Sequence, residues 1–133
     1  MKKLFIAEKP SVAKQFAEAL GVGSVGGGKG FIESVEYIFT WCVGHLISMS
    51  YPEKYDSALQ KWRMDTLPFI PEKYLYEVIP SVKEQFKVVS SLLERKDVET
   101  IYICTDSGRE GEYIYRLVSA ECPHISAEEK RVW

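Results

Sequence analysis

The stretch Val98–Ala120, VETIYICTDSGREGEYIYRLVSA, places an apolar run, a polar turn and an amphipathic pattern in direct succession. Residues 98–104 are predominantly apolar, which is typical of a parallel strand that is buried on both faces. Residues 112–120 repeat apolar side chains at helical spacing. A strand that leads straight into a helix is the repeating unit of α/β folds with a parallel sheet.

A second unit of the same kind opens the chain. Residues 4–7 form another apolar run within a predicted strand over residues 3–7, and a helical pattern follows over residues 10–20. Pro10 suits the first helical turn, and Gly21 suits the position just past the helix end. Right-handed connections would place strands 3–7 and 98–104 side by side, with their carboxyl ends at one edge. We therefore expect an α/β fold with a mostly parallel central sheet flanked by helices.

The segment between these two units is more varied. Residues 21–30 are glycine-rich and approach two nucleotide-binding motifs in spacing, but they follow a helix and lack the required context, so they predict a surface loop. Residues 31–35 and 37–43 are typical of a strand hairpin. Residues 50–80, rich in proline and aromatic side chains, predict an irregular segment lying over the core. Residues 82–93 show the spacing of an amphipathic helix.

Length and composition limit the class of protein. The chain has 133 residues, 46% hydrophobic and 27% charged, as expected of one globular domain. Its formal net charge of −2 provides no overall basic field, so any contact with nucleic acid must be local. Cys42, Cys104 and Cys122 lack paired spacing and predict buried thiols. No apolar run is long enough for a bilayer span or a signal peptide, so we expect no membrane partner and a cytoplasmic location.

Three acidic residues fall at the ends of the two predicted parallel strands. Asp106 and Glu110 lie where strand 98–104 gives way to its helix, and Glu8 directly follows strand 3–7. If the strands are neighbours, the three carboxylates share the edge at which open α/β sheets bind ligands. Such carboxylates repel each other unless a cation lies between them, and oxygen ligands suit Mg²⁺. The alternative is that Asp106 and Glu110 only cap and charge the helix start.

Five stretches carry a family resemblance: FIAEKPSVAKQFAEALG (5–21), TWCVGHL (40–46), PEKYDSALQKWRMDTLPFIP (52–71), CTDSGREGEYIYR (104–116) and KRVW (130–133). Together they resemble the toprim domain at the amino terminus of type IA DNA topoisomerases, most closely the bacterial topoisomerase III group. The resemblance covers nearly the whole chain. It implies one toprim domain over residues 1–133, with a Rossmann-like parallel sheet between helices.

The resemblance implies roles for individual residues. Glu8 matches the family's early glutamate, proposed as acid/base for the 3′ oxygen, and Lys9 matches a lysine that contacts the scissile phosphate. Asp106 and Glu110 match the first and last acids of an Asp-x-Asp-x-Glu motif, which binds Mg²⁺ together with the early glutamate. Gly108 departs from this motif because the family's common pattern has Asp there. We therefore expect weak binding of one Mg²⁺.

Four further residues are candidates for the same site, and each has a structural alternative. Arg109 would offset charge on the phosphate or bridge to a carboxylate. Ser11 would contact phosphate or help to cap its helix. His45, at the end of a predicted strand, would line the cleft or pack as an ordinary hydrogen-bonded histidine. Glu112 would assist the acidic site or lie at the surface of the helix start.

The implied activity is that of an enzyme that passes single DNA strands through a transient tyrosine-linked break. None of the eight tyrosines stands in a motif for the nucleophile, so we expect that tyrosine and the remaining domains beyond Trp133, and no activity from the fragment alone. DNA is the expected partner, Mg²⁺ the expected cofactor and the nucleoid the expected location. The rivals are another toprim enzyme, such as a metal-dependent nuclease or a primase, and a non-catalytic nucleotide-binding module.

Overall fold

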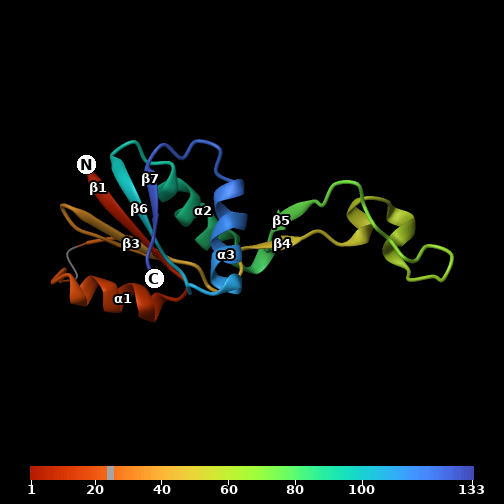
Figure 1. Ribbon diagram of the computed structural model, residues 1–133, viewed down its shortest axis with the longest axis horizontal. Helices are drawn as coiled ribbons and strands as arrows, with labels where there is room; N and C mark the ends of the chain where they lie inside the picture. The colour runs from red at the N-terminus through yellow and green to blue at the C-terminus, as the bar shows by residue number, and fades with distance from the viewer. Residues whose placement is uncertain (24–25) are drawn as a thin grey trace.

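A central sheet organises the body of the protein in the computed structural model, which describes residues 1–23 and 26–133 (Figure 1). Within these residues the sheet has five strands in the order β2-β3-β1-β6-β7. Their bounds are β1 (Lys2–Ala7), β2 (Phe31–Glu33), β3 (Tyr37–Trp41), β6 (Val98–Cys104) and β7 (Glu128–Arg131). β3, β1, β6 and β7 are parallel, whereas β2 pairs antiparallel with β3. The predicted mostly parallel α/β sheet and the predicted hairpin are confirmed.

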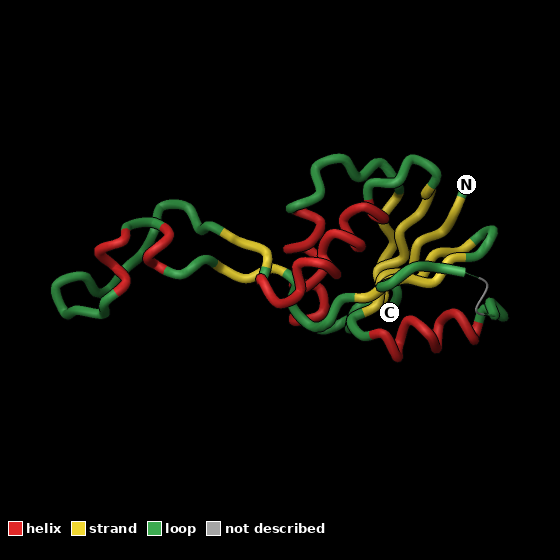
Figure 2. The backbone as a smooth tube through the Cα atoms, turned by 180° about the vertical axis from the view of Figure 1, so that it is seen from behind, coloured by secondary structure: helices red, strands yellow, loops and turns green. Residues whose placement is uncertain are grey.

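Helices cover both faces of this sheet. Helix α1 (Pro10–Ala19) lies on one face, and α2 (Lys83–Leu93) and α3 (Arg109–Ala120) lie on the other (Figures 1 and 2). The alternation of side chains along β1 serves both layers. Its residues Leu4 and Ile6 belong to the larger apolar core with α2 and α3, while Ala7 belongs to the smaller core with α1. Burial on both faces explains why β1 has the continuous apolar run of a central parallel strand.

The helix boundaries follow local chemistry. Pro10 is the first residue of α1, and Gly21 adopts a φ of +67° just past its end, as the sequence predicts. Helix α3 begins at Arg109, one turn before the predicted start at residue 112, and Gly108 is its N-cap. The predicted loop over residues 21–30 forms no helix or strand where it is described, and Ser24 and Val25 lie outside the described residues.

The segment between β3 and α2 corrects one prediction. It does not lie over the core but projects away from the body as an arm, residues 47–78 (Figures 1 and 2). At its root β4 (Ile47–Met49) pairs antiparallel with β5 (Tyr76–Val78), and further out are two 3₁₀ turns, Pro52–Lys54 and Ser57–Gln60. Within the arm Tyr55 packs edge-on against Phe69, whereas Trp62 and Tyr51 are exposed. Another 3₁₀ turn, Pro80–Val82, leads from the arm root into α2.

Strand β7 was not predicted from the sequence. Its segment, EEKR, is charged throughout and carries no apolar alternation, because it is an edge strand whose pairing is supplied by the backbone of β6. Among the described residues, no helix combines the length and the apolar character that crossing a bilayer requires.

Candidate active site

The carboxyl ends of three parallel strands bring the predicted residues to one edge. Ala7, the last residue of β1, is in register with Trp41 of β3 and with Cys104 of β6. Glu8 therefore leaves the sheet beside the loop that carries Asp106. The prediction that strands 3–7 and 98–104 are neighbours with a shared carboxyl edge is confirmed.

The acidic residues differ in their surroundings. Glu8 is half-buried at the end of β1, whereas Asp106 and Glu110 are exposed around the start of α3. No hydrogen bond or ion pair of the Asp106 carboxylate occurs within the described part of the chain. The N-cap of α3 is Gly108, and no side-chain hydrogen bond caps this helix. The alternative role of Asp106 and Glu110 as capping residues is therefore not supported by a hydrogen bond. Their negative charge still lies at the positive end of the helix dipole.

His45 joins this group from the connection between β3, which ends at Trp41, and β4, which begins at Ile47. Its Nε2 contacts Oε1 of Glu110, and its ring meets that of Tyr113 edge-on with centroids 5.8 Å apart. The predicted alternative of a hydrogen-bonded histidine is therefore observed, and a role of His45 in lining a cleft stays a prediction. The sequence placed His45 at a strand end but gave no sign of its partner Glu110.

The basic and hydroxyl candidates lie at the starts of two helices. Lys9 is the N-cap of α1 and is exposed, and Ser11 is exposed in the first turn. No side-chain hydrogen bond caps α1, so Ser11 does not act as the predicted cap. Arg109 is the exposed first residue of α3, and within the described residues its guanidinium pairs with no carboxylate. Lys9, Ser11 and Arg109 are thus accessible to a phosphate.

Glu112, in contrast, is already engaged. Its carboxylate lies 2.7 Å from Nε of Arg116 and 3.5 Å from Nε of Arg131. These two pairs favour the structural alternative for Glu112. Arg131 was not singled out from the sequence, where it was only part of the KRVW stretch.

Two glycines around the start of α3, Gly108 and Gly111, have different environments. Gly108 has φ −72° and ψ 174°, and a Cβ built there meets no atom within 4 Å. Its position therefore does not require the conformational freedom of glycine. A Cβ on Gly111 would stand 2.0 Å from the main-chain oxygen of Asp106, so the helix reaches the loop only because residue 111 lacks a side chain. Sequence reasoning missed Gly111, although a glycine inside a helical pattern signals a close approach.

The donor chemistry at this edge suits a hard divalent cation, since Glu8, Asp106 and Glu110 all offer carboxylate oxygens. Among the described residues, however, no three His, Cys, Asp or Glu side chains are grouped so that they could hold a metal ion. One of the three, Glu110, is turned to His45. The three-carboxylate Mg²⁺ site stays a prediction, and forming it requires a rearrangement of side chains.

The cysteines take no part in this chemistry. Burial, and secondarily the charge of Glu8, raises the pKa of Cys42 to about 12, and burial raises the pKa of Cys104 to about 12. Both thiols stay protonated at neutral pH. No disulfide links Cys42, Cys104 and Cys122 within the described residues, and all three are buried as predicted.

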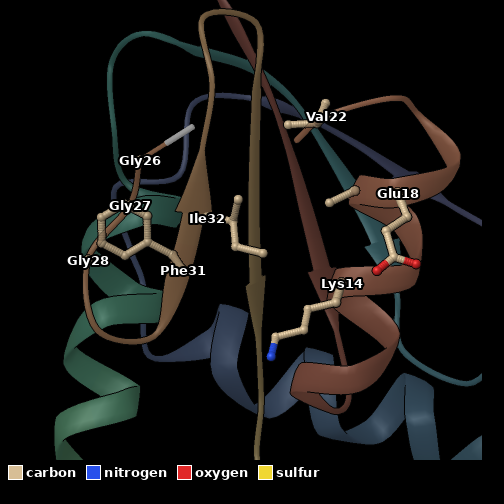
Figure 3. Close-up of a pocket in the computed structure, with 9 residues that line it drawn as sticks. Lys14, Glu18, Val22, Gly26, Gly27, Gly28, Phe31 and Ile32 are labelled. Atoms are coloured by element: carbon tan, nitrogen blue, oxygen red, sulfur yellow. The ribbon is translucent and has the colours of Figure 1, made fainter. Parts of the chain in front are cut away.

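A cavity of about 390 Å³ lies elsewhere, between α1, β2 and the glycine-rich loop (Figure 3). Lys14 and Glu18 of α1 face Ile32 across it. None of the predicted site residues lines it. The cavity and the acidic edge are therefore separate features of the molecule.

Fold and site together define an α/β domain with a Rossmann-like parallel sheet that gathers acidic and basic side chains at its carboxyl edge. Comparison with known proteins gives the family: the model of the Toprim domain matches residues 3–133, and the chain belongs to that family. It is 43% identical over 133 residues to DNA topoisomerase 3 of Staphylococcus haemolyticus (strain JCSC1435) and 42% identical over 132 residues to DNA topoisomerase 3 of Bacillus thuringiensis (strain Al Hakam). These matches cover 100% and 99% of the chain but 18% of each relative's length.

Proposed function

We propose that residues 1–133 are the toprim module of a type IA DNA topoisomerase III. The single observation that carries this proposal is the meeting of Glu8 and Asp106 at one sheet edge, on neighbouring strands in register at Ala7 and Cys104. The relatives named DNA topoisomerase 3 support it, since they match the chain from end to end. The nucleophilic tyrosine and the other domains would lie in the larger part of such an enzyme, C-terminal to Trp133.

The residues of the edge fit a cleavage reaction in which a tyrosine attacks a DNA phosphodiester. The departing 3′ oxygen needs a proton, and in this proposal Glu8 would supply it. Lys9 and Arg109, both exposed at this edge, offset the charge on the phosphate. Asp106 and Glu110, with Glu8, would hold Mg²⁺, and a bound Mg²⁺ would supply charge stabilisation at the phosphate. DNA would be the substrate, and the location would be cytoplasmic, at the nucleoid.

The experiment is a relaxation assay of the full-length enzyme carrying Glu8→Gln. This substitution keeps the shape of the side chain and replaces its acidic carboxyl group with an amide that cannot act as the acid. We expect strand cleavage or rejoining to be crippled while the protein folds normally. A matched control is Glu84→Gln, at an exposed acid of α2 that pairs only with Lys87 among the described residues. Full relaxation by the Glu8→Gln enzyme would remove Glu8 from the mechanism.

The isolated 133-residue chain provides a second test. We expect it neither to relax nor to cleave DNA. Metal-dependent nicking by the purified chain would favour a toprim nuclease instead. Absence of any Mg²⁺-dependent change at the carboxyl edge would favour a non-catalytic module whose acids are structural.

A further inference from the structure

Arg131, the last residue of β7, reaches across the carboxyl end of β6 to the loop that carries Asp106. Its guanidinium donates a hydrogen bond of 2.8 Å to the hydroxyl of Thr105 and another to the main-chain oxygen of Asp106. A longer bond of 3.5 Å goes to the carbonyl oxygen of Ile103. The Arg131 side chain is 15% exposed, so these bonds are made in a largely desolvated position. Hydrogen bonds from a charged donor are among the stronger ones in proteins.

The same guanidinium also holds the start of α3. Its Nε lies 3.5 Å from Oε2 of Glu112, in the first turn of the helix. Arg131 thus joins the edge strand, the loop after β6 and the helix start. The planar fork of an arginine can serve several acceptors at once, which a lysine ammonium cannot do with the same geometry.

The main chain of Asp106 therefore has two close neighbours. Gly111 of α3 packs against it, and Arg131 donates a hydrogen bond to its carbonyl oxygen. The preceding residue, Thr105, is 2% exposed. The Asp106 carboxylate itself is exposed and has no partner among the described residues, so the backbone is fixed while the ligand group stays available.

We propose that Arg131 is a positioning residue of the acidic site. It holds the main chain of Asp106 so that the carboxylate stands ready for a divalent cation, and it touches neither the cation nor DNA. This inference rests on the proposed function only in taking the acidic edge as the metal site. Partners behind a metal ligand commonly govern affinity in this way.

The first measurement is a Mg²⁺ titration of the 133-residue chain by calorimetry. We expect Arg131→Gln to weaken Mg²⁺ binding about tenfold, a typical effect of losing a group that supports a metal ligand. Arg131→Lys should recover only part of the loss. Arg116→Gln is the matched control, because it removes the other arginine bound to Glu112 and leaves Asp106 untouched; its affinity should equal that of the parent.

The second measurement is amide hydrogen exchange without metal. Exchange over residues 105–112 should speed up in Arg131→Gln and in Thr105→Val, which removes the acceptor hydroxyl at constant shape, and should stay unchanged in the rest of the sheet. A folded Arg131→Gln chain with parental Mg²⁺ affinity and parental exchange would overturn the inference. If Arg131→Gln does not fold, Thr105→Val decides by the same two readouts. A parent chain that binds no Mg²⁺ would contradict the proposed metal site, while exchange would still show whether Arg131 holds the loop.

Discussion

Gly111 lies in the first turn of α3, and a Cβ there would stand 2.0 Å from the Asp106 carbonyl oxygen and 2.7 Å from the Asp106 main-chain nitrogen. Both atoms belong to backbone, which cannot move aside as a flexible side chain does. The contact places the helix start directly against the acidic loop. At the scale of single residues, the close approach that Gly111 allows determines how Asp106 and Glu110 lie relative to each other.

We therefore expect Gly111→Ala to lower the free energy of unfolding by about 1–3 kcal/mol, the usual range for overpacking a buried position. Urea denaturation measures it. Gly108→Ser is the control, since position 108 has open space and is the N-cap of α3. The control should be neutral or stabilising by a few tenths of a kcal/mol. Equal stability of Gly111→Ala and the parent would show that the main chain around Asp106 moves aside without cost, which contradicts this prediction.

A second residue-scale prediction concerns Gly108→Asp. Because the position has extended backbone and open space, aspartate fits there, and we expect it to tighten Mg²⁺ binding severalfold by adding a motif carboxylate. Calorimetric titration with Mg²⁺ measures the change. Gly108→Asn is the control that separates the effect of the negative charge from the effect of helix capping, since aspartate and asparagine both cap helices but only aspartate is charged. Unchanged affinity in a folded Gly108→Asp chain would mean that position 108 does not face the ion.

At the scale of elements, the amino-terminal side of the sheet is held by charges. Arg95, in the turn after α2, lies 2.9 Å from Glu33 of β2 and 2.7 Å from Asp97, which precedes β6. Lys2 of β1 lies 3.0 Å from the same Glu33 oxygen. Hydrogen bonds from Arg95 are the main cause that lowers the pKa of Glu33 and of Asp97.

Stability should therefore depend on pH in the acid range. Because the two carboxyl pKa values are lower in the folded than in the unfolded chain, the unfolded chain binds more protons near pH 4, and folding stability rises with pH there. The contribution is complete above about pH 5 and is lost as the pH falls through the folded-state values. Urea denaturation across pH 2–6 should show a shallower slope for Arg95→Met. The control Lys87→Met, at an exposed pair with Glu84, should keep the parental slope; an Arg95→Met profile parallel to the parent would contradict this account.

The sequence predicted the elements whose burial leaves a pattern. Strands β1 and β6 are buried on both faces and therefore carry apolar runs, and Pro10 and Gly21 mark the ends of α1. Strand β7 has no such pattern because its pairing comes from backbone bonds to β6. The arm was misplaced because its aromatic residues resemble those of a core, whereas Tyr55 packs on Phe69 within the arm, with ring centroids 5.1 Å apart, and Trp62 is exposed.

At the scale of the whole molecule, the outer part of the arm, residues 51–74, projects away from the body (Figures 1 and 2). Beyond its root the described residues contribute nothing to either apolar core, and Trp62 is 83% exposed. We expect that replacing residues 51–74 with Asn-Gly, which closes a tight hairpin between Ser50 and Leu75, changes the unfolding free energy by less than about 1 kcal/mol. Thermal and urea unfolding measure it. A chain that no longer folds would show that the arm supports the body.

The candidate site was partly predictable for a reason of topology. Two apolar runs are each followed by an acidic residue, Glu8 after the first and Asp106 after the second. Right-handed connections make the two strands parallel neighbours, and their acidic residues then share one edge of the sheet. The contact of His45 with Glu110 and the bonds of Arg131 depend on side chains brought together from distant segments. No spacing along the chain encodes those contacts, so only the structure reveals them.

An NMR titration of the 133-residue chain with Mg²⁺, observed through its backbone amides, tests the proposed metal site. We predict shifts confined to residues 8–11, His45 and residues 105–112, with weak affinity, and their loss in Asp106→Asn. Shifts that survive in Asp106→Asn, or that occur only away from the carboxyl edge of the sheet, would contradict the claim that this edge binds the metal.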